Sequence, residues 1–330
     1  MSTIGYRPPE AKARFWVFSD LQQSDPEHAE YCMHAGVEDF LSLRLPVDAV
    51  CYLGDSTEGT NLAALETMSD MQVRELARVD APIYYTMGNH EFDYHRAKDP
   101  PGCLTIPILD RIRNLRQWHA APKIDDWMFR AEVNGLGLVF FTDHAAPDGS
   151  WWTTHGWPHT REKSGWHPYF PEVQAVQNGS YAEALACGTP TTPEGCEASS
   201  IKGRLGRLDK PFFTFSHYAF PGGNRDDEGP LPKSLLPLPK TCVAHFYGHS
   251  HCGDHVWGRH NLFRQISTVN ESAVSQFDVA SLEDRRGNTV RSAVVEWYGG
   301  HAYGVHFRDH LAHAWTKTYL QACDPSDAGA

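Results

Sequence analysis

Tyr84-Tyr85-Thr86-Met87-Gly88-Asn89-His90-Glu91 is a short apolar run that stops at a glycine and continues into an amide, an imidazole and a carboxylate. Residues 82–87 are typical of a buried β-strand, because proline bounds them on one side and glycine on the other. Gly88 allows a sharp turn, so Asn89 and His90 are predicted to lie on a loop at the strand's carboxyl end. In open α/β sheets, ligands bind at this edge.

The segments around this strand predict a parallel α/β arrangement. Strand-like apolar runs alternate with segments whose apolar residues recur at helical spacing, and the connections are short. This order favours parallel pairing with right-handed crossovers. The predicted elements are strands at 15–19, 47–53 and 82–87 and helices at 26–45 and 62–79.

The rest of the chain is predicted to be rich in strands. A hairpin is expected over 129–142, since Asn134-Gly135 is a type I′ turn signal between alternating apolar residues. Buried strands are expected at 212–216 and 242–247, each ending just before a histidine-bearing segment. Strands with alternating apolar residues are expected to follow, including 292–297 and 303–307. A helix is expected at 106–118.

The length of 330 residues allows one large domain or two modest ones, and we expect a single domain over residues 1–330. With 41% hydrophobic and 21% charged residues, the composition is that of an ordinary soluble globular protein. The balance of 29 Lys+Arg against 41 Asp+Glu gives a net charge of −12, which argues against a general nucleic-acid-binding surface. An anionic substrate stays open, because bound divalent cations reverse the local field.

No secretory signal precedes the first strand and no run of about 18 apolar residues occurs, so we expect a cytoplasmic protein without a membrane span. The eight cysteines are scattered. Cys51 and Cys242 lie in strand-like runs and are expected to be buried free thiols. Cys187 and Cys196 share a loop-like region and could pair, but only in an oxidising compartment.

Residues 145–207 form a different kind of segment, with four tryptophans among several prolines and glycines. A long irregular segment in a compact domain is usually functional or disordered, and the tryptophans argue against disorder. We expect a cap within the single domain, with Trp151 and Trp152 as surfaces on which substrate could stack; a satellite core or a subunit interface is the alternative. His144, just before this insert, is a further candidate substrate contact.

Polar residues gather just past the predicted strand ends. They are Asp20, Gln22, Asp55, Asn89, His217, His249 and His251. Carboxylates, amides and imidazoles without cysteine suit Mn, Fe, Zn or Mg rather than a thiolate-held structural zinc. Seven ligands are too many for one ion and fit two, with Asp55 able to bridge them. Taken singly, such an aspartate is often a helix N-cap and such a histidine a core residue, but five clusters at five strand ends are hard to explain structurally.

These clusters resemble the five motifs of the calcineurin-like metallophosphoesterase superfamily. The motifs are Asp20-x-Gln22, Gly54-Asp55-x-x-Glu58-Gly59, Gly88-Asn89-His90-Glu91, Ser216-His217 and Gly248-His249-x-His251. The resemblance implies an α/β (α+β) fold, a four-layer β-sandwich flanked by helices with an irregular cap insert. It also implies a dinuclear metal centre and hydrolysis of phosphoric esters.

The resemblance also implies a role for each motif residue. One metal would be held by Asp20, Gln22 and His251. The other would be held by Asn89, His217 and His249. Asp55 would bridge the two ions and so be essential to catalysis, while His90 would contact the substrate phosphate beside Asn89 and help protonate the leaving oxygen.

Gln22 departs from the common pattern, which has histidine at this position. An amide oxygen is a harder and weaker ligand than imidazole, which indicates a shift toward Mn or Mg at this site, or lower occupancy of it. Mn is the expected metal of the pair, with Fe, Zn and Mg as the alternatives. Glutamine at this position resembles the branch of manganese-dependent ADP-ribose and CDP-alcohol diphosphatases. The resemblance implies a small phosphorylated metabolite as substrate, with nucleoside-diphosphate-linked compounds among the candidates. The alternatives are iron-dependent oxidative chemistry at the same centre and a non-catalytic binding protein, which the filled ligand positions disfavour.

Overall fold

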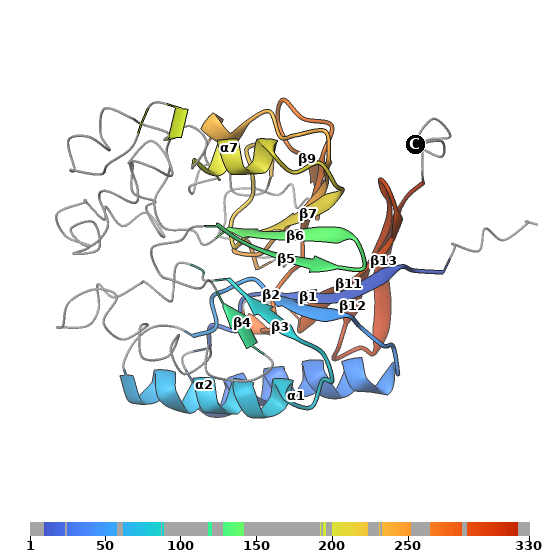
Figure 1. Ribbon diagram of the computed structural model, residues 1–330. Coiled ribbons are helices and arrows are strands. Elements are labelled where there is room, and N and C mark those ends of the chain that lie inside the picture. The colour runs from blue at the N-terminus through green and yellow to red at the C-terminus, as the bar shows by residue number, and fades with distance from the viewer. Residues whose placement is uncertain are drawn as a thin grey trace, which may run out of the picture.

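Two facing β-sheets form the centre of the computed structural model, which describes residues 10–23, 25–57, 62–86, 88, 118–120, 128–141, 192, 194–195, 200–223, 231, 233–251, 265–285 and 289–322 (Figure 1). The first sheet has the order β13-β12-β11-β1-β2-β3-β4 and the second the order β5-β6-β7-β8-β10-β9. The first sheet contains β1 (Ala13–Phe18), β2 (Ala49–Tyr52), β3 (Ile83–Tyr85), β4 (Trp118–Ala120), β11 (Arg291–Gly299), β12 (Ala302–Asp309) and β13 (Ala314–Gln321). The second contains β5 (Met128–Val133), β6 (Leu136–Phe141), β7 (Phe212–Phe215), β8 (Cys242–Tyr247), β9 (Ile266–Thr268) and β10 (Ser275–Asp278).

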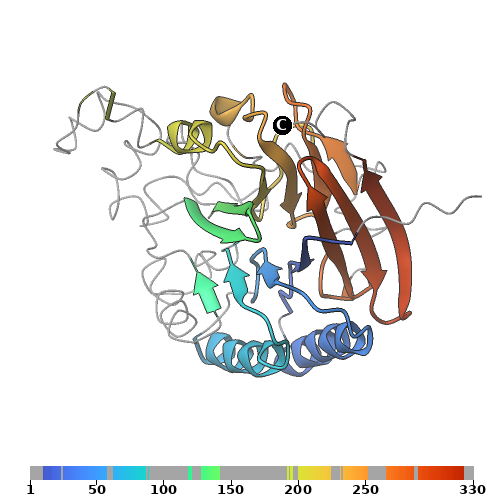
Figure 2. The ribbon, with the colours of Figure 1, turned by 45° about the vertical axis from the view of Figure 1, so that its right-hand side comes forward.

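Side chains that alternate along the strands fill three hydrophobic layers. On β1, Phe15 and Val17 face the second sheet, whereas Trp16 and Phe18 face the helices. Helices α1 (Pro26–Ser42) and α2 (Leu62–Leu76) lie side by side over the outer face of the first sheet (Figures 1 and 2). Helix α7 (Ile201–Gly206) and the 3₁₀ turn η3 (Lys233–Leu235) cover the second sheet. The predicted four-layer sandwich is therefore confirmed.

Helix α1 illustrates how local sequence sets these layers. Its N-cap Asp25 accepts a hydrogen bond from the Glu27 amide, and Pro26 occupies the first turn, where no amide partner is needed. Its buried residues follow helical spacing, and Phe40 stacks on Trp16 at a ring distance of 4.2 Å. The helix thereby packs against β1 and fixes the strand whose carboxyl end carries Asp20.

Parallel pairing brings the strand ends to one edge, as predicted. Strands β1 to β4 pair in parallel, and so do β6, β7, β8 and β10. The ends of the two sheets meet there: the His217 ring Nδ1 donates to the Leu53 carbonyl at 2.8 Å, and the His249 amide donates to Asp20 Oδ2 at 2.9 Å. The β5–β6 hairpin is also confirmed, with positive φ at Asn134 (52°) and at Gly135 (85°).

Several elements differ from prediction. Strand β13 was not predicted, because its side chains are mostly exposed and lack an apolar alternation. The helix predicted at 106–118 lies outside the described residues apart from Trp118, which begins β4. Most of the predicted insert 145–207 also lies outside them. Its last part forms α7, whose Ile201 and Leu205 are buried in the core against the second sheet.

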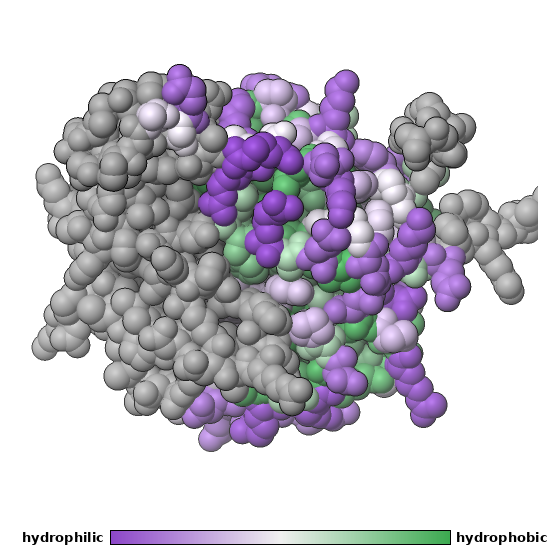
Figure 3. Space-filling view, in the orientation of Figure 1, coloured by the Kyte–Doolittle hydropathy of each residue, from purple (hydrophilic) through white to green (hydrophobic). Residues whose placement is uncertain are grey.

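The thiols and the surface complete the description of the fold. Cys51 and Cys242 are buried free thiols, as predicted, and Cys32 is a third; Cys187 and Cys196 lie outside the described residues. On the face seen in Figure 3, hydrophobic side chains are interspersed with hydrophilic ones. Within the described part of the chain, no helix has the length and apolar character needed to cross a membrane.

Candidate metal centre

Four of the predicted ligands have an unusual backbone conformation. Asp20, Asp55, His249 and His251 have φ values of 56°, 53°, 64° and 57°, in the left-handed region that side-chain-bearing residues seldom adopt. They follow directly on the ends of β1, β2 and β8. Such strain costs of order 1–3 kcal/mol per residue and persists where the surrounding structure imposes it, often at functional sites. Here it coincides with the convergence of these side chains.

The first cluster consists of Asp55, His217 and His249, whose ligand atoms all lie within 4.8 Å of one another. His217 Nε2 lies 3.1 Å from Asp55 Oδ2 and 3.2 Å from His249 Nδ1. His217 Nδ1 donates to the Leu53 carbonyl at 2.8 Å. Because that contact fixes the proton on Nδ1, the Nε2 lone pair points into the cluster.

The second cluster consists of Asp20, Asp55 and His251, and it also lies within 4.8 Å. His251 Nε2 is 3.4 Å from Asp20 Oδ1 and 2.5 Å from Gln22 Nε2. The backbone amide of His249 donates to Asp20 Oδ2 at 2.9 Å, which ties the two loops together. Asp55 is the one residue that the two clusters share.

Two buried acceptors, one in the second cluster and one beside it, lack hydrogen bonds within the described residues. Asp20 Oδ1 and Gln22 Oε1 are both buried without a hydrogen-bond donor. An unsatisfied buried acceptor costs about 1–3 kcal/mol, more when it is charged. A cation would satisfy the Asp20 oxygen, and a rotated Gln22 amide would present its oxygen to the same ion. The donor set of carboxylate, amide and imidazole suits divalent metals such as Mn, so these residues fit a metal pair.

Glu283 is a contributor that the sequence reasoning missed. It is fully buried, it accepts a hydrogen bond from His251 Nδ1, and its other oxygen accepts from Arg285 Nε at 2.5 Å. Burial alone would lower the pKa of His251, but Glu283 and then Asp20 raise it overall. Burial would raise the pKa of Glu283, but His251 and Arg285 lower it overall. The carboxylate thereby holds the proton on Nδ1 and aims Nε2 at Asp20 and Gln22.

The two motif glycines leave room for this centre. A Cβ on Gly88 would lie 2.8 Å from Cγ of His217 and would overlap Asp55, and a Cβ on Gly248 would overlap Ser19 and Asp20. The φ of Gly88 is outside the left-handed region, so close approach rather than a special turn requires glycine there. This differs from the predicted reason for Gly88.

The structure brings six of the seven predicted ligands together. They are Asp20, Gln22, Asp55, His217, His249 and His251. The other predicted site residues lie outside the described residues and remain predictions. They are Asn89, His90, His144, Trp151 and Trp152. The alternative role of Asp20 as a helix cap does not hold, because Asp25 is the N-cap of α1.

Known proteins include a family and solved structures to which this chain is similar. The family model of calcineurin-like phosphoesterases matches residues 13–253. A dimetal phosphatase from Danio rerio is similar in structure with a TM-score of 0.55 and 13% identity, covering 94% of this chain and 99% of that one. GAP50, the anchor in the inner membrane complex of Plasmodium, gives a TM-score of 0.51 and 11% identity, covering 93% and 88%.

At these identities the two structural likenesses establish the fold alone, and no curated protein sequence matches the chain. The family match spans well over half of the 330 residues. The chain therefore belongs to the calcineurin-like phosphoesterase family, whose members are metal-dependent phosphoric ester hydrolases.

Proposed function

We propose that this protein hydrolyses a phosphoester or phosphoanhydride bond in a small metabolite, with two divalent cations bound at the strand ends. Asp20, Gln22 and His251 hold one ion in this proposal. Asn89, His217 and His249 hold the other. The observation that carries the proposal is that Asp55 belongs to both three-residue clusters, which is the position a bridging ligand must occupy.

Bound cations of this kind lower the pKa of a coordinated water towards neutrality and offset the charge on the phosphoryl group. The protein's own part is to hold the ligands in place. The Leu53 carbonyl fixes the orientation of His217, and Glu283 fixes that of His251. Asp20 and Asp55 bring two negative charges, which offset part of the positive charge of the two ions. His90 serves as the proton donor to the leaving oxygen and contacts the phosphate beside Asn89.

The metal preference is proposed to be Mn, with Fe, Zn and Mg as weaker alternatives. Gln22 contributes an amide where imidazole is common, and a harder oxygen ligand favours Mn. The Gln22 side chain is buried against His251, so the amide lies where a ligand of this ion is needed.

The substrate class is proposed to be nucleoside-diphosphate-linked metabolites. A metal pair recognises only the phosphoryl group, so discrimination has to come from other residues. We assign this role to residues 145–207 with Trp151 and Trp152, and to His144. An aromatic ring that stacks on a base contributes roughly 1–3 kcal/mol.

The test is a screen of phosphomonoesters, phosphodiesters and nucleoside diphosphate-linked compounds, each with Mn, Mg, Fe and Zn supplied separately. The proposal expects the highest kcat/KM for a diphosphate-linked nucleotide with Mn, and loss of that activity in Asp55→Asn. Glu296→Gln is the control, because it also neutralises a carboxylate. Glu296 pairs with Arg14 at the start of β1, whereas Asp55 follows the opposite end of the parallel neighbour β2. Metal-loaded protein that turns over no substrate of any class would contradict the proposal and favour a binding role.

A further inference from the structure

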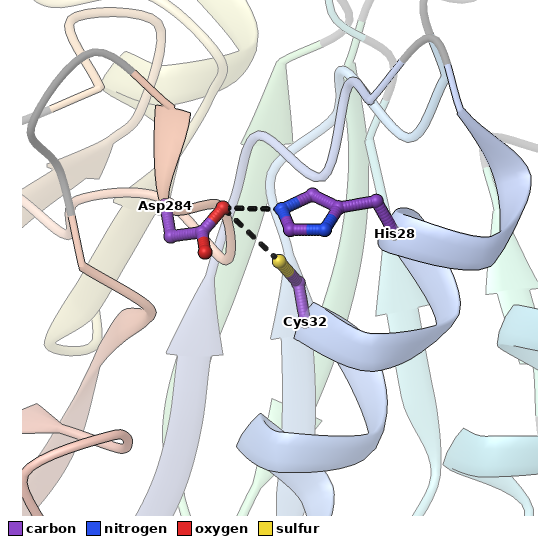
Figure 4. A group of neighbouring side chains, drawn as sticks. All are labelled: His28, Cys32 and Asp284. Carbon is purple, nitrogen blue, oxygen red and sulfur yellow. Dashed lines mark hydrogen bonds and ion pairs between the residues drawn. The ribbon is translucent and has the colours of Figure 1, made fainter.

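A second group of metal-ligating side chains lies apart from the dinuclear cluster. His28 and Cys32 are four residues apart on α1, and Asp284 lies in the segment that follows β10 (Figure 4). Side chains four apart on a helix share one face, and both point at the same carboxylate. His28 Nε2 donates to Asp284 Oδ1 at 2.6 Å, and Cys32 Sγ lies 3.7 Å from the same oxygen. The three ligand atoms all lie within 4.8 Å of one another.

This group has a different chemistry from the dinuclear cluster. It includes a sulfur, whereas the six ligands placed together at the strand ends are oxygen and nitrogen donors. Thiolate, imidazole and carboxylate together are typical ligands of Zn²⁺. The two negative charges of a thiolate and a carboxylate would balance the charge of the ion.

The distances suit a tetrahedral ion after a small adjustment. Zinc–ligand bonds of roughly 2.0–2.3 Å place neighbouring ligand atoms roughly 3.3–3.7 Å apart. The Cys32–Asp284 separation of 3.7 Å already has this value, whereas the 2.6 Å contact between His28 and Asp284 must widen. The side chains of His28 and Asp284 are 41% and 25% exposed, which lets His28 turn and gives an ion and a water access from solvent.

We propose that His28, Cys32 and Asp284 form a third cation site, specific for Zn²⁺ or a similar thiophilic divalent metal, with solvent water as its fourth ligand. A role as a reactive thiol fits the structure less well. Cys32 is fully buried, and burial, followed by the nearby Asp284 charge, raises the pKa of its thiol to about 12 in the metal-free protein. The free thiol is therefore a poor nucleophile at neutral pH, whereas an ion that binds the sulfur displaces its proton.

An ion at this site would connect α1 to the segment that supports the dinuclear centre. Asp284 directly follows Glu283, which holds His251. Leu282, on the other side, is buried against Gly36 of α1, and its amide donates to the Ser19 carbonyl. The proposed ion therefore stabilises the packing of α1 against residues 282–284 and does not contact the substrate.

The test uses Co²⁺ as a spectroscopic substitute for Zn²⁺. Metal-free protein titrated with Co²⁺ should develop the near-ultraviolet charge-transfer band of a Co²⁺–thiolate bond. The band should disappear in Cys32→Ser and need more Co²⁺ in His28→Ala, whose half-exposed side chain can be removed without opening the core. Cys242→Ser is the matched control: it removes another buried thiol, and Thr214 can partner the new hydroxyl. This control should keep the band.

A band absent from the wild type, or retained in Cys32→Ser, would overturn the proposal. A second measurement separates loss of the site from misfolding. Without metal, Cys32→Ser should melt within a few degrees of the wild type, and Zn²⁺ should raise the melting temperature of the wild type more than that of the variant. Equal Zn²⁺-induced shifts in the two proteins would also contradict the site.

Discussion

Replacing Glu283 by glutamine removes the charge that orients His251 while keeping the shape of the side chain. Both oxygens of Glu283 accept hydrogen bonds, one from His251 Nδ1 and the other from Arg285 Nε. Glutamine has only one oxygen. If that oxygen faces His251, its amino group confronts the Arg285 donor. If the amino group faces His251 instead, the proton must move to Nε2, which can then no longer ligate a cation.

The size of the effect follows from this geometry. Arg285 is 21% exposed and can turn to solvent, so the first arrangement is accessible and the fold should survive. Loss of a hydrogen-bonding partner behind a metal-ligating histidine typically weakens metal binding or activity by about 10–100-fold. That corresponds to about 1.4–2.8 kcal/mol of binding free energy. Saturating metal should restore much of the activity, because the ligands themselves remain.

The assay is a Mn²⁺ titration of wild type, Glu283→Gln and Glu296→Gln by calorimetry, with kcat/KM measured at low and saturating Mn²⁺. Glu296 is a fair control, since it also accepts from an arginine, at 2.8 Å, and from a tyrosine hydroxyl. Unchanged Mn²⁺ affinity in Glu283→Gln would refute the orienting role. An equal loss in Glu296→Gln would indicate general destabilisation instead.

Three further predictions concern single side chains. His90→Ala should keep its metal but lose about 10²–10⁴-fold in turnover, with a smaller loss for substrates that have good leaving groups; equal losses for all substrates would argue against a proton donor. Gln22→His should shift metal activation from Mn towards Zn or Fe, and an unchanged activation profile would remove Gln22 from the ligand set. Asp39→Asn should lower the unfolding free energy at neutral pH by about 3–5 kcal/mol, because it breaks a buried ion pair with Arg308. Burial would raise the pKa of Asp39, but hydrogen bonds from His310, Arg308 and His313 hold it well below its usual range. The stability difference between wild type and Asp39→Asn should therefore shrink as the pH falls below about 4, which denaturant unfolding at several pH values would measure. A stability difference independent of pH would contradict the assignment.

The parts of the fold that could be predicted have local causes. The strands β1, β2, β3, β7 and β8 are short apolar runs between turn-forming residues, and α1 has both its cap and its apolar spacing in its own sequence. Strand β13 could not be predicted in this way, because it pairs at an exposed edge and its pattern carries no apolar face. Its conformation depends on β12, which is a tertiary effect.

The candidate site likewise contains residues whose positions could be predicted from the sequence and residues that only tertiary contacts bring close. Asp20, Asp55 and His217 follow predictable strands, so their convergence could be expected from parallel pairing. Glu283 lies 32 residues from His251, and tertiary contacts such as the pairing of β10 with β8 bring its segment close. Acidic residues after an apolar run were the available signal, but nothing in the sequence linked them to a particular histidine. The approach of Asp284 to Cys32 has the same origin, a contact between distant segments.

The central claim is that Asp55 is shared by two metal ions. Its most direct test is a count of bound Mn²⁺ per chain, in wild type and in Asp55→Asn, combined with the activity of each. We predict two Mn²⁺ per wild-type chain, and in Asp55→Asn weakened binding of both ions with loss of most activity, because one substitution removes a ligand from both clusters. A wild type that binds a single ion, together with an Asp55→Asn variant that stays active, would contradict the claim.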